Sequence, residues 1–229
     1  MFFAVLWGNL VVADRLKPVL RVKSAEDDLV ERYHAAVGSH AGKLRFAVAA
    51  VFGLISGANT SSQWENWMLF RSGGDFGWTD PLFGRDAGFY VFRLPFWSFV
   101  VDWFFATAVL TVIVLLVAHY LNGGIRAATA SSEEERVSKG VKIHLSVLLA
   151  VLAVLRAVAY WLDRFHLLTS DRGAYDGALT TDVNIQLPAL NLLTMISLFC
   201  AALFIANVRR TGWGSVSYTH LTLPTIYSV

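Results

Sequence analysis

Long apolar stretches separated by short polar segments dominate the hydrophobic pattern of this chain. Three of them, residues 96–121, 143–162 and 189–208, are at least 20 residues long and each contains at most one Asp, Glu, Lys or Arg. A membrane-spanning helix needs about 20 mostly apolar residues to cross roughly 30 Å of hydrocarbon. The pattern therefore predicts three spanning helices, and Pro95 is expected to open the first of them because proline fits the first helical turn.

Two further apolar segments give a weaker signal. Residues 44–62 end in four polar residues, but Ala49, Gly53 and Gly57 stand four apart, a spacing that lets two membrane helices pack closely. We interpret this segment as a further span. Residues 1–13 are apolar but short, and we interpret them as part of a membrane helix because basic residues follow at once. A short buried or interfacial segment is the alternative. Residues 63–71 are expected to form an interfacial helix.

Composition agrees with a membrane protein. Hydrophobic residues make up 55% of the chain, charged residues only 16%, and the mean hydropathy is +0.52. These values exclude a disordered tail and a collagen-like fibre. A single cysteine, Cys200, excludes an internal disulfide, and a net charge of +2 gives no indication of nucleic-acid binding. The predicted fold class is all-α, a polytopic transmembrane helix bundle over residues 1–215 with aromatic-rich outer loops.

Lys and Arg residues predict the orientation of the bundle. Residues 14–45 contain seven of them, 63–95 three, 122–142 four and 163–188 two, and Arg209 and Arg210 follow the last span. Short cytoplasmic loops carry an excess of Lys and Arg. Loops 14–43 and 122–142 are therefore expected to be cytoplasmic, and loops 63–95 and 163–188 extracytoplasmic.

The end of the chain has a different character. Residues 216–225 read VSYTHLTLPT and resemble the translation of a sequencing adaptor. We therefore expect residues 216–229 to be a non-native, adaptor-derived tail, and the chain to be a fragment of a longer protein.

A long motif precedes the 96–121 span. Residues 80–96 read DPLFGRDAGFYVFRLPF, and this run resembles the signature of the uncharacterised protein family UPF0182, multipass bacterial membrane proteins prominent in actinobacteria. The motif residues are Asp80, Pro81, Phe83, Gly84, Asp86, Gly88, Phe89, Phe92, Leu94 and Pro95. Supporting similarity lies at 119–124, 159–164 and 181–189.

The resemblance carries structural implications for the rest of the protein. It implies seven membrane helices followed by a large extracytoplasmic region. The seventh helix and that region would then be missing here and, with the lipid bilayer, would be the expected partners. It implies no established enzymatic activity.

Two charged residues stand deep inside the predicted spans. Asp102 lies seven residues after Pro95, and Arg156 seven residues before Asp163. At 1.5 Å per residue both lie roughly 10 Å below the same membrane boundary. Because a charge there is costly, we expect the two to form an intramembrane pair. The favoured interpretation is a structural pair or an Arg156 that snorkels outward, and a gated ion pair or proton-relay element is the alternative.

The outer loops hold eight acidic residues and one histidine, His166. Their spacing matches neither an EF-hand nor a zinc motif, and no catalytic motif is found. Turn formation beside Pro or Gly accounts for Asp80, Asp86 and Asp176 without a metal. We therefore predict no catalytic, metal or cofactor site. The acidic residues are Glu65, Asp75, Asp80, Asp86, Asp163, Asp171, Asp176 and Asp182.

Three classes of function remain open. An envelope-associated membrane anchor or assembly protein is favoured, because polar residues do not line the spans at the density of a transporter. A transporter or permeation protein would use Asp102 and Arg156. A membrane-bound envelope enzyme would depend on the outer loops or on the missing region.

Overall fold

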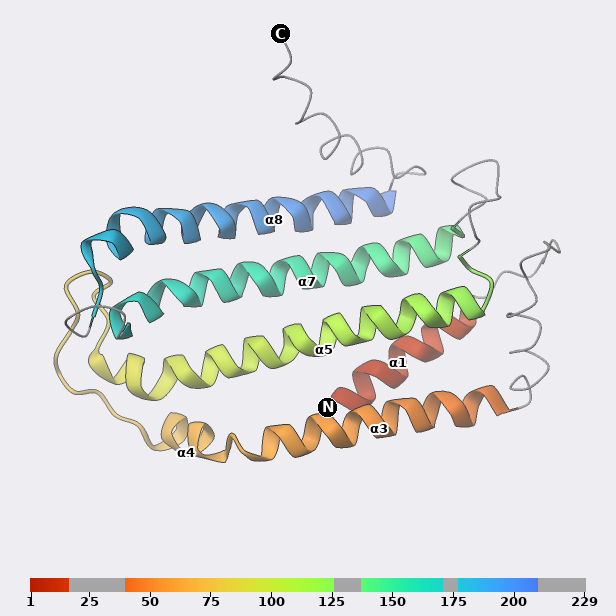
Figure 1. The fold of residues 1–229 in the computed structure, drawn as a ribbon, viewed down its shortest axis with the longest axis horizontal. Helices are drawn as coiled ribbons and strands as arrows, with labels where there is room; N and C mark the ends of the chain where they lie inside the picture. Colours follow the sequence, from red (N-terminus) through yellow and green to blue (C-terminus); the bar gives the residue numbers. More distant parts are fainter. Residues whose placement is uncertain (17–39, 126–136, 171–176, 210–229) are drawn as a thin grey trace, which may run out of the picture. The chain divides into compact units, whose positions relative to one another are not determined.

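The computed structural model describes residues 1–16, 40–125, 137–170 and 177–209 (Figure 1). Much of the predicted loops, Asp171 and Asp176, and the predicted foreign tail 216–229 lie outside these residues. The described part of the chain is helical and contains no β-strand, only two isolated bridges. The elements are α1 (Phe2–Arg15), α3 (Ala41–Ser61), α4 (Trp64–Ser72), η2 (Phe89–Arg93), α5 (Leu94–Leu121), α7 (Lys139–His166), η3 (Leu167–Thr169), η4 (Asp182–Gln186) and α8 (Leu187–Arg209).

Four helical stretches are long and apolar enough to cross a membrane: Ala41–Ala58, Phe89–Leu121, Lys139–Thr169 and Asp182–Val208. They confirm the predicted fold class, and α4 lies where the interfacial helix was predicted. The last three are longer than the predicted spans. The hydropathy pattern ends at the first charges, whereas the backbone continues as a helix beyond them because its hydrogen bonds are satisfied within the segment.

Helix α5 begins at Leu94, so Pro95 stands in its first turn as expected, and α8 likewise begins at Leu187. A π-helical turn, η2, precedes Leu94 and Pro95, and the Leu94 N–H donates to the Phe89 carbonyl five residues back. η4 precedes Leu187 in the same way. Proline inside an α-helix lacks an N–H and clashes with the carbonyl four residues earlier. The wider π turn accommodates this local mismatch and extends the helix by five residues.

The structure consists of two compact units, and each is described by itself. Unit 1 comprises the described residues within 1–54, 109–150 and 202–229. In it α1 packs against α3: the Phe3 and Phe46 rings lie 5.3 Å apart, and Asp14 pairs with Arg45 at 2.8 Å. Ala49 is buried, and a Cβ on Gly53 would lie only 3.1 Å from the Phe3 Cβ. The small residues of α3 thus allow close approach of α1 in this unit.

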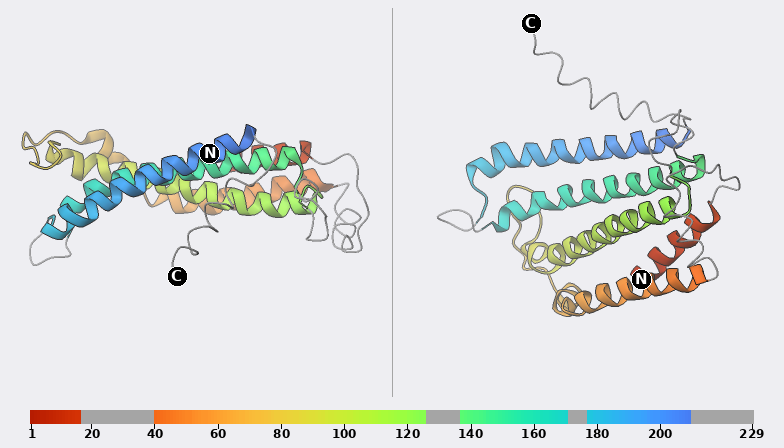
Figure 2. Two further views of the ribbon diagram at one scale, coloured as in Figure 1. Left: turned by 90° about the horizontal axis from the view of Figure 1, so that it is seen from above. Right: turned by 45° about the vertical axis from the view of Figure 1, so that its right-hand side comes forward.

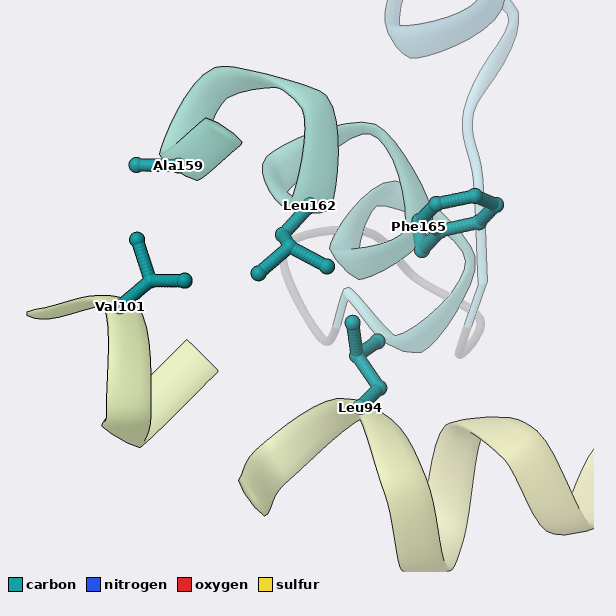
Figure 3. Close-up of a cluster of buried hydrophobic side chains, with 5 residues drawn as sticks. All are labelled: Leu94, Val101, Ala159, Leu162 and Phe165. Atoms are coloured by element: carbon teal, nitrogen blue, oxygen red, sulfur yellow. The ribbon is translucent and has the colours of Figure 1, made fainter. Parts of the chain in front are cut away.

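Unit 2 comprises the described residues within 55–108 and 151–201. Its core lies between α5 and α7 and is built from Leu94, Val101, Ala159, Leu162 and Phe165 (Figure 3). The two helices lie side by side in the views of Figures 1 and 2. In this unit a Cβ on Gly57 would meet no atom within 4 Å, so this predicted packing glycine faces open space.

Candidate functional site

A single buried carboxylate organises the loop that carries the long sequence motif, hereafter the signature loop (residues 75–93). Asp80 Oδ1 accepts hydrogen bonds from the Leu82 and Phe83 N–H groups, at 2.9 and 2.5 Å. Asp80 Oδ2 accepts from the Arg85 N–H at 2.8 Å and from the Tyr90 hydroxyl at 2.7 Å. The carboxylate thus holds four donors, and the sequence-based prediction of a turn-forming aspartate is confirmed here.

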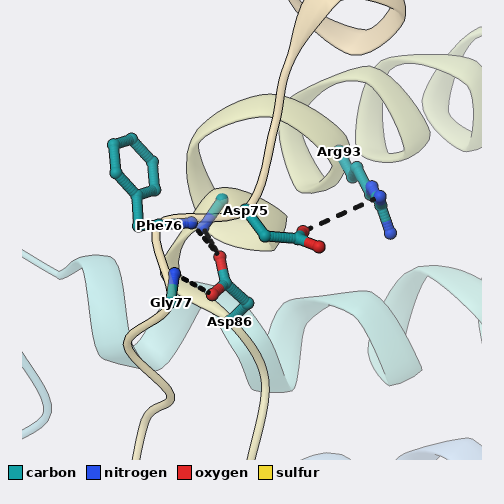
Figure 4. A network of polar contacts seen from close by, with 6 residues as sticks. Asp75, Phe76, Gly77, Asp86 and Arg93 are labelled. Carbon is teal, nitrogen blue, oxygen red and sulfur yellow. Dashed lines mark hydrogen bonds and ion pairs between the residues drawn. The ribbon is translucent and has the colours of Figure 1, made fainter.

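A second carboxylate closes the start of the same loop. Asp86 accepts hydrogen bonds from the Phe76 and Gly77 N–H groups, both at 2.9 Å (Figure 4). The predicted turn-forming role is confirmed for Asp86 as well. Asp75 and Arg93 form an exposed ion pair at 3.9 Å across the loop. Because long, exposed pairs contribute little, the loop depends on the two carboxylates that bind backbone N–H groups.

Hydrogen bonding also sets the acidity of both carboxyl groups. Burial raises the pKa of Asp80, but the hydrogen bonds from Phe83, Tyr90, Arg85 and Leu82 outweigh it and hold that pKa below its ordinary value. The hydrogen bond from the Phe76 N–H is the main reason that the pKa of Asp86 is also lowered. Both groups are therefore ionised at neutral pH.

The signature loop packs against the end of α7. The ring of Phe165 contacts those of Phe83 and Phe89 at centroid distances of 4.9 and 5.1 Å, and that of Tyr90 at 6.4 Å. Gly88 allows the loop to close, because a Cβ there would lie 2.2 Å from the Gly74 carbonyl oxygen. The loop therefore fixes the last turn of α7, which carries His166.

A serine and a histidine meet across α5 and α7 in unit 2. Ser98 Oγ lies 2.8 Å from His166 Nε2, and both side chains are half-buried. Asp163, three residues before His166 on the same helix, interacts electrostatically with the imidazole. His166 stands among the outer acidic residues in the sequence, but their spacing gives no indication of this contact.

The structure does not show the expected pairing of Asp102 with Arg156. The Arg156 guanidinium carbon lies 5.6 Å from the Phe105 ring centroid and 4.4 Å from that of Tyr160. Asp102 is exposed and has no hydrogen-bond or ion-pair partner within the described ranges. Both residues lie in unit 2. The direction of each side chain depends on helix rotation, which depth leaves open.

Unit 1 contains a chain of three polar side chains from three helices. The Asn9 amide donates to the Val5 carbonyl at 2.7 Å, which turns its oxygen towards His144 Nε2, 3.0 Å away. His144 Nε2 therefore carries a proton, and in a neutral His144 the Nδ1 atom accepts from His119 Nε2 at 3.2 Å. His119 is 1% exposed.

No metal cluster accompanies these side chains. Within residues 1–16, 40–125, 137–170 and 177–209, no group of three or more His, Cys, Asp or Glu side chains is placed to hold a metal ion. The two histidine contacts join residues 25 and 68 positions apart in the sequence. No spacing motif encodes such contacts, so they could not be predicted from the sequence.

The helices and the signature loop together define an all-α, polytopic membrane protein. The model of the uncharacterised protein family UPF0182 matches residues 1–229. The chain belongs to this family, as the motif at 80–96 indicated. Because the match includes residues 216–229, it does not set the predicted foreign tail apart from the rest.

Curated relatives carry the same family name. The chain is 44% identical to a UPF0182 protein of Frankia alni over 91% of this chain and 20% of the relative. It is 41% identical to a UPF0182 protein of Salinispora arenicola, over 93% of this chain and 22% of the relative. It is 42% identical to a UPF0182 protein of Mycobacterium tuberculosis, over 86% of this chain and 20% of the relative. The chain thus spans about a fifth of the length of the curated relatives it matches. No solved structure matches it.

Proposed function

We propose that this chain is the membrane-embedded part of an envelope protein that acts as an anchor or assembly scaffold. The observation that carries the proposal is the signature loop, which is held by Asp80 and packed on Phe165. The same loop exposes large aromatic side chains, with Phe76 61% and Trp78 65% accessible. A rigid loop that displays apolar side chains is suited to contact with another polypeptide.

The proposal also assigns a location and an orientation. The alternation of Lys and Arg supports insertion in the cell membrane, with loops 63–95 and 163–188 outside and loops 14–43 and 122–142 in the cytoplasm. The signature loop would then face the envelope. Because the relatives are about five times longer, other parts of the full-length protein are natural occupants of this surface.

Photocrosslinking in cells tests the scaffold. A benzophenone amino acid is introduced at Phe76 or Trp78 of the full-length protein, and adducts are analysed by mass spectrometry. We expect a discrete crosslink to another polypeptide or to another segment of the same protein. Asp80→Asn should abolish it because the loop loses its shape, whereas Asp75→Asn should leave it intact. Incorporation of the probe without any polypeptide adduct would refute the scaffold.

The chain of Asn9, His144 and His119 favours proton-coupled permeation as a second candidate function. Ionisable residues inside a membrane bundle commonly mark proton pathways. Full-length protein in vesicles loaded with a pH-sensitive dye should then carry protons when a pH gradient is imposed, and His144→Gln should stop the flux. Flux equal to that of protein-free vesicles would dismiss this candidate.

A further inference from the structure

Beyond the scaffold, we propose that Ser98 and His166 form a nucleophile–base pair that cleaves acyl esters of lipids at the membrane boundary. The 2.8 Å contact between Ser98 Oγ and His166 Nε2 is within the range at which an imidazole acts as general base for a hydroxyl. The two residues come from different helices, α5 and α7, of the same unit.

The hydrogen bonding of Ser98 differs from that of three threonines in these helices. Thr60, Thr107 and Thr194 each donate to the carbonyl four residues earlier, the usual partner of a helical hydroxyl. Ser98 forms its hydrogen bond with His166 instead. Its hydroxyl is thus directed at a base rather than satisfied by its own helix.

Neighbouring packing holds the base in place. Phe165, the residue before His166, is buried in the core with Leu94 and Leu162 (Figure 3). Phe83 of the signature loop packs against its ring. The position of His166 therefore depends on a rigid turn rather than on a free helix end. The side chains of Ser98 and His166 themselves are only half-buried, which leaves them accessible to a substrate.

Depth in the membrane indicates the class of substrate. The stretch Phe89–Leu121 has 33 residues, about 50 Å at 1.5 Å per residue, and is longer than the roughly 30 Å hydrocarbon core. Ser98 and His166 lie towards the ends of their stretches, where the core meets the headgroups. Trp97 and Trp161 are 46% and 40% exposed at this level, as expected at an interface. Ester bonds of acyl lipids lie at the same depth.

The reaction requires only water as co-reactant. Ser98 Oγ attacks the ester carbonyl carbon while its proton passes to His166 Nε2, and the alcohol leaves with that proton. Water then attacks the acyl-serine and gives its proton to His166, which returns it to Ser98 Oγ as the acid departs. The sum is ester plus water giving carboxylic acid plus alcohol.

An alkyl fluorophosphonate tests the pair in the full-length protein in native membranes. Ser98 should displace fluoride and form a covalent phosphonate, identified by mass spectrometry on the peptide that contains it. Ser98→Ala should abolish labelling. His166→Gln retains a hydrogen-bond partner but not a base, so labelling should slow by roughly 10²–10⁴-fold. Ser56→Ala, a helical serine of unit 2 that accepts from the Trp103 indole, is the matched control and should label like wild type.

Each outcome decides the proposal. A serine hydrolase added to the same membranes is the positive control for labelling. If that hydrolase is labelled and Ser98 of the wild-type protein carries no adduct, the proposal is overturned. Labelling of His166→Gln at the wild-type rate also overturns it, because the serine would then react without its base. A long-chain fluorophosphonate should react faster than a short-chain one, and equal rates would overturn the lipid substrate. The crosslinking experiment on the scaffold does not depend on any of these three labelling results, so the two proposals can fail separately.

Discussion

Replacing Asp80 by asparagine is expected to open the signature loop while leaving the helices intact. The carboxylate offers two acceptor oxygens to four donors, the N–H groups of Leu82, Phe83 and Arg85 and the Tyr90 hydroxyl. Asparagine has the same shape but only one oxygen. If that oxygen serves Leu82 and Phe83, the amide nitrogen faces Arg85 and Tyr90. The Tyr90 hydroxyl can rotate and accept, but the Arg85 N–H is left without an acceptor.

The structure gives the size of this effect. A buried donor without a partner costs about 1–3 kcal/mol. The remaining hydrogen bonds lose the assistance of the negative charge, which roughly doubles the strength of such bonds. Together these losses lower the free energy of opening the loop by about 2–4 kcal/mol. Since each 1.4 kcal/mol is a factor of ten, amide exchange in the loop should accelerate by roughly 30- to 1,000-fold.

Hydrogen exchange with mass spectrometry on the detergent-solubilised protein measures this acceleration. The peptide containing Leu82, Phe83 and Arg85 should exchange faster, whereas peptides from the middle of α5 should not change. Asp75→Asn is the matched control, because it removes a carboxylate of the same loop whose ion pair with Arg93 is exposed and 3.9 Å long. It should cost less than about 1 kcal/mol. Equal exchange in the two variants would refute the assignment of Asp80 as the residue that holds the loop.

Three other changes follow from the same geometry. The pKa of Asp80 is lower in the folded protein than in the unfolded chain. The ionised carboxylate therefore stabilises the signature loop above about pH 4, and this stabilisation is lost as the pH falls through the folded-state pKa. Amide exchange in the loop, corrected for intrinsic rates, should rise on acidification. Gly88→Ala should lower the melting temperature because its Cβ would meet the Gly74 carbonyl oxygen, whereas Gly74→Ala, with no atom within 4 Å, should melt nearly like wild type. Asn9→Leu should destabilise the protein by about 1–3 kcal/mol, because the His144 N–H loses its acceptor. A thermal or denaturant melt measures this loss, and an unchanged melt would contradict the assigned tautomer of His144.

Features encoded by short stretches of sequence could be predicted. Runs of apolar residues determine the spanning helices, because a helix in lipid satisfies its own backbone hydrogen bonds and needs no partner to be recognised. The turns at Asp80 and Asp86 were also predictable, because each carboxylate binds backbone N–H groups within about ten residues of itself. The family motif at 80–96 lies in the same stretch, so resemblance and local chemistry indicated the same segment.

Contacts between helices depend on rotation and on which helices are neighbours, and hydropathy encodes neither. Depth alone suggested a pair between Asp102 and Arg156, but the Arg156 guanidinium lies over aromatic rings. Helix rotation instead brings Ser98 to His166, 68 residues along the chain. The apolar pattern around α5 is nearly uniform, so no polar face in the sequence marks which side meets α7. The amino-acid sequence therefore determined which stretches form long apolar helices, and only their packing decided which polar side chains meet.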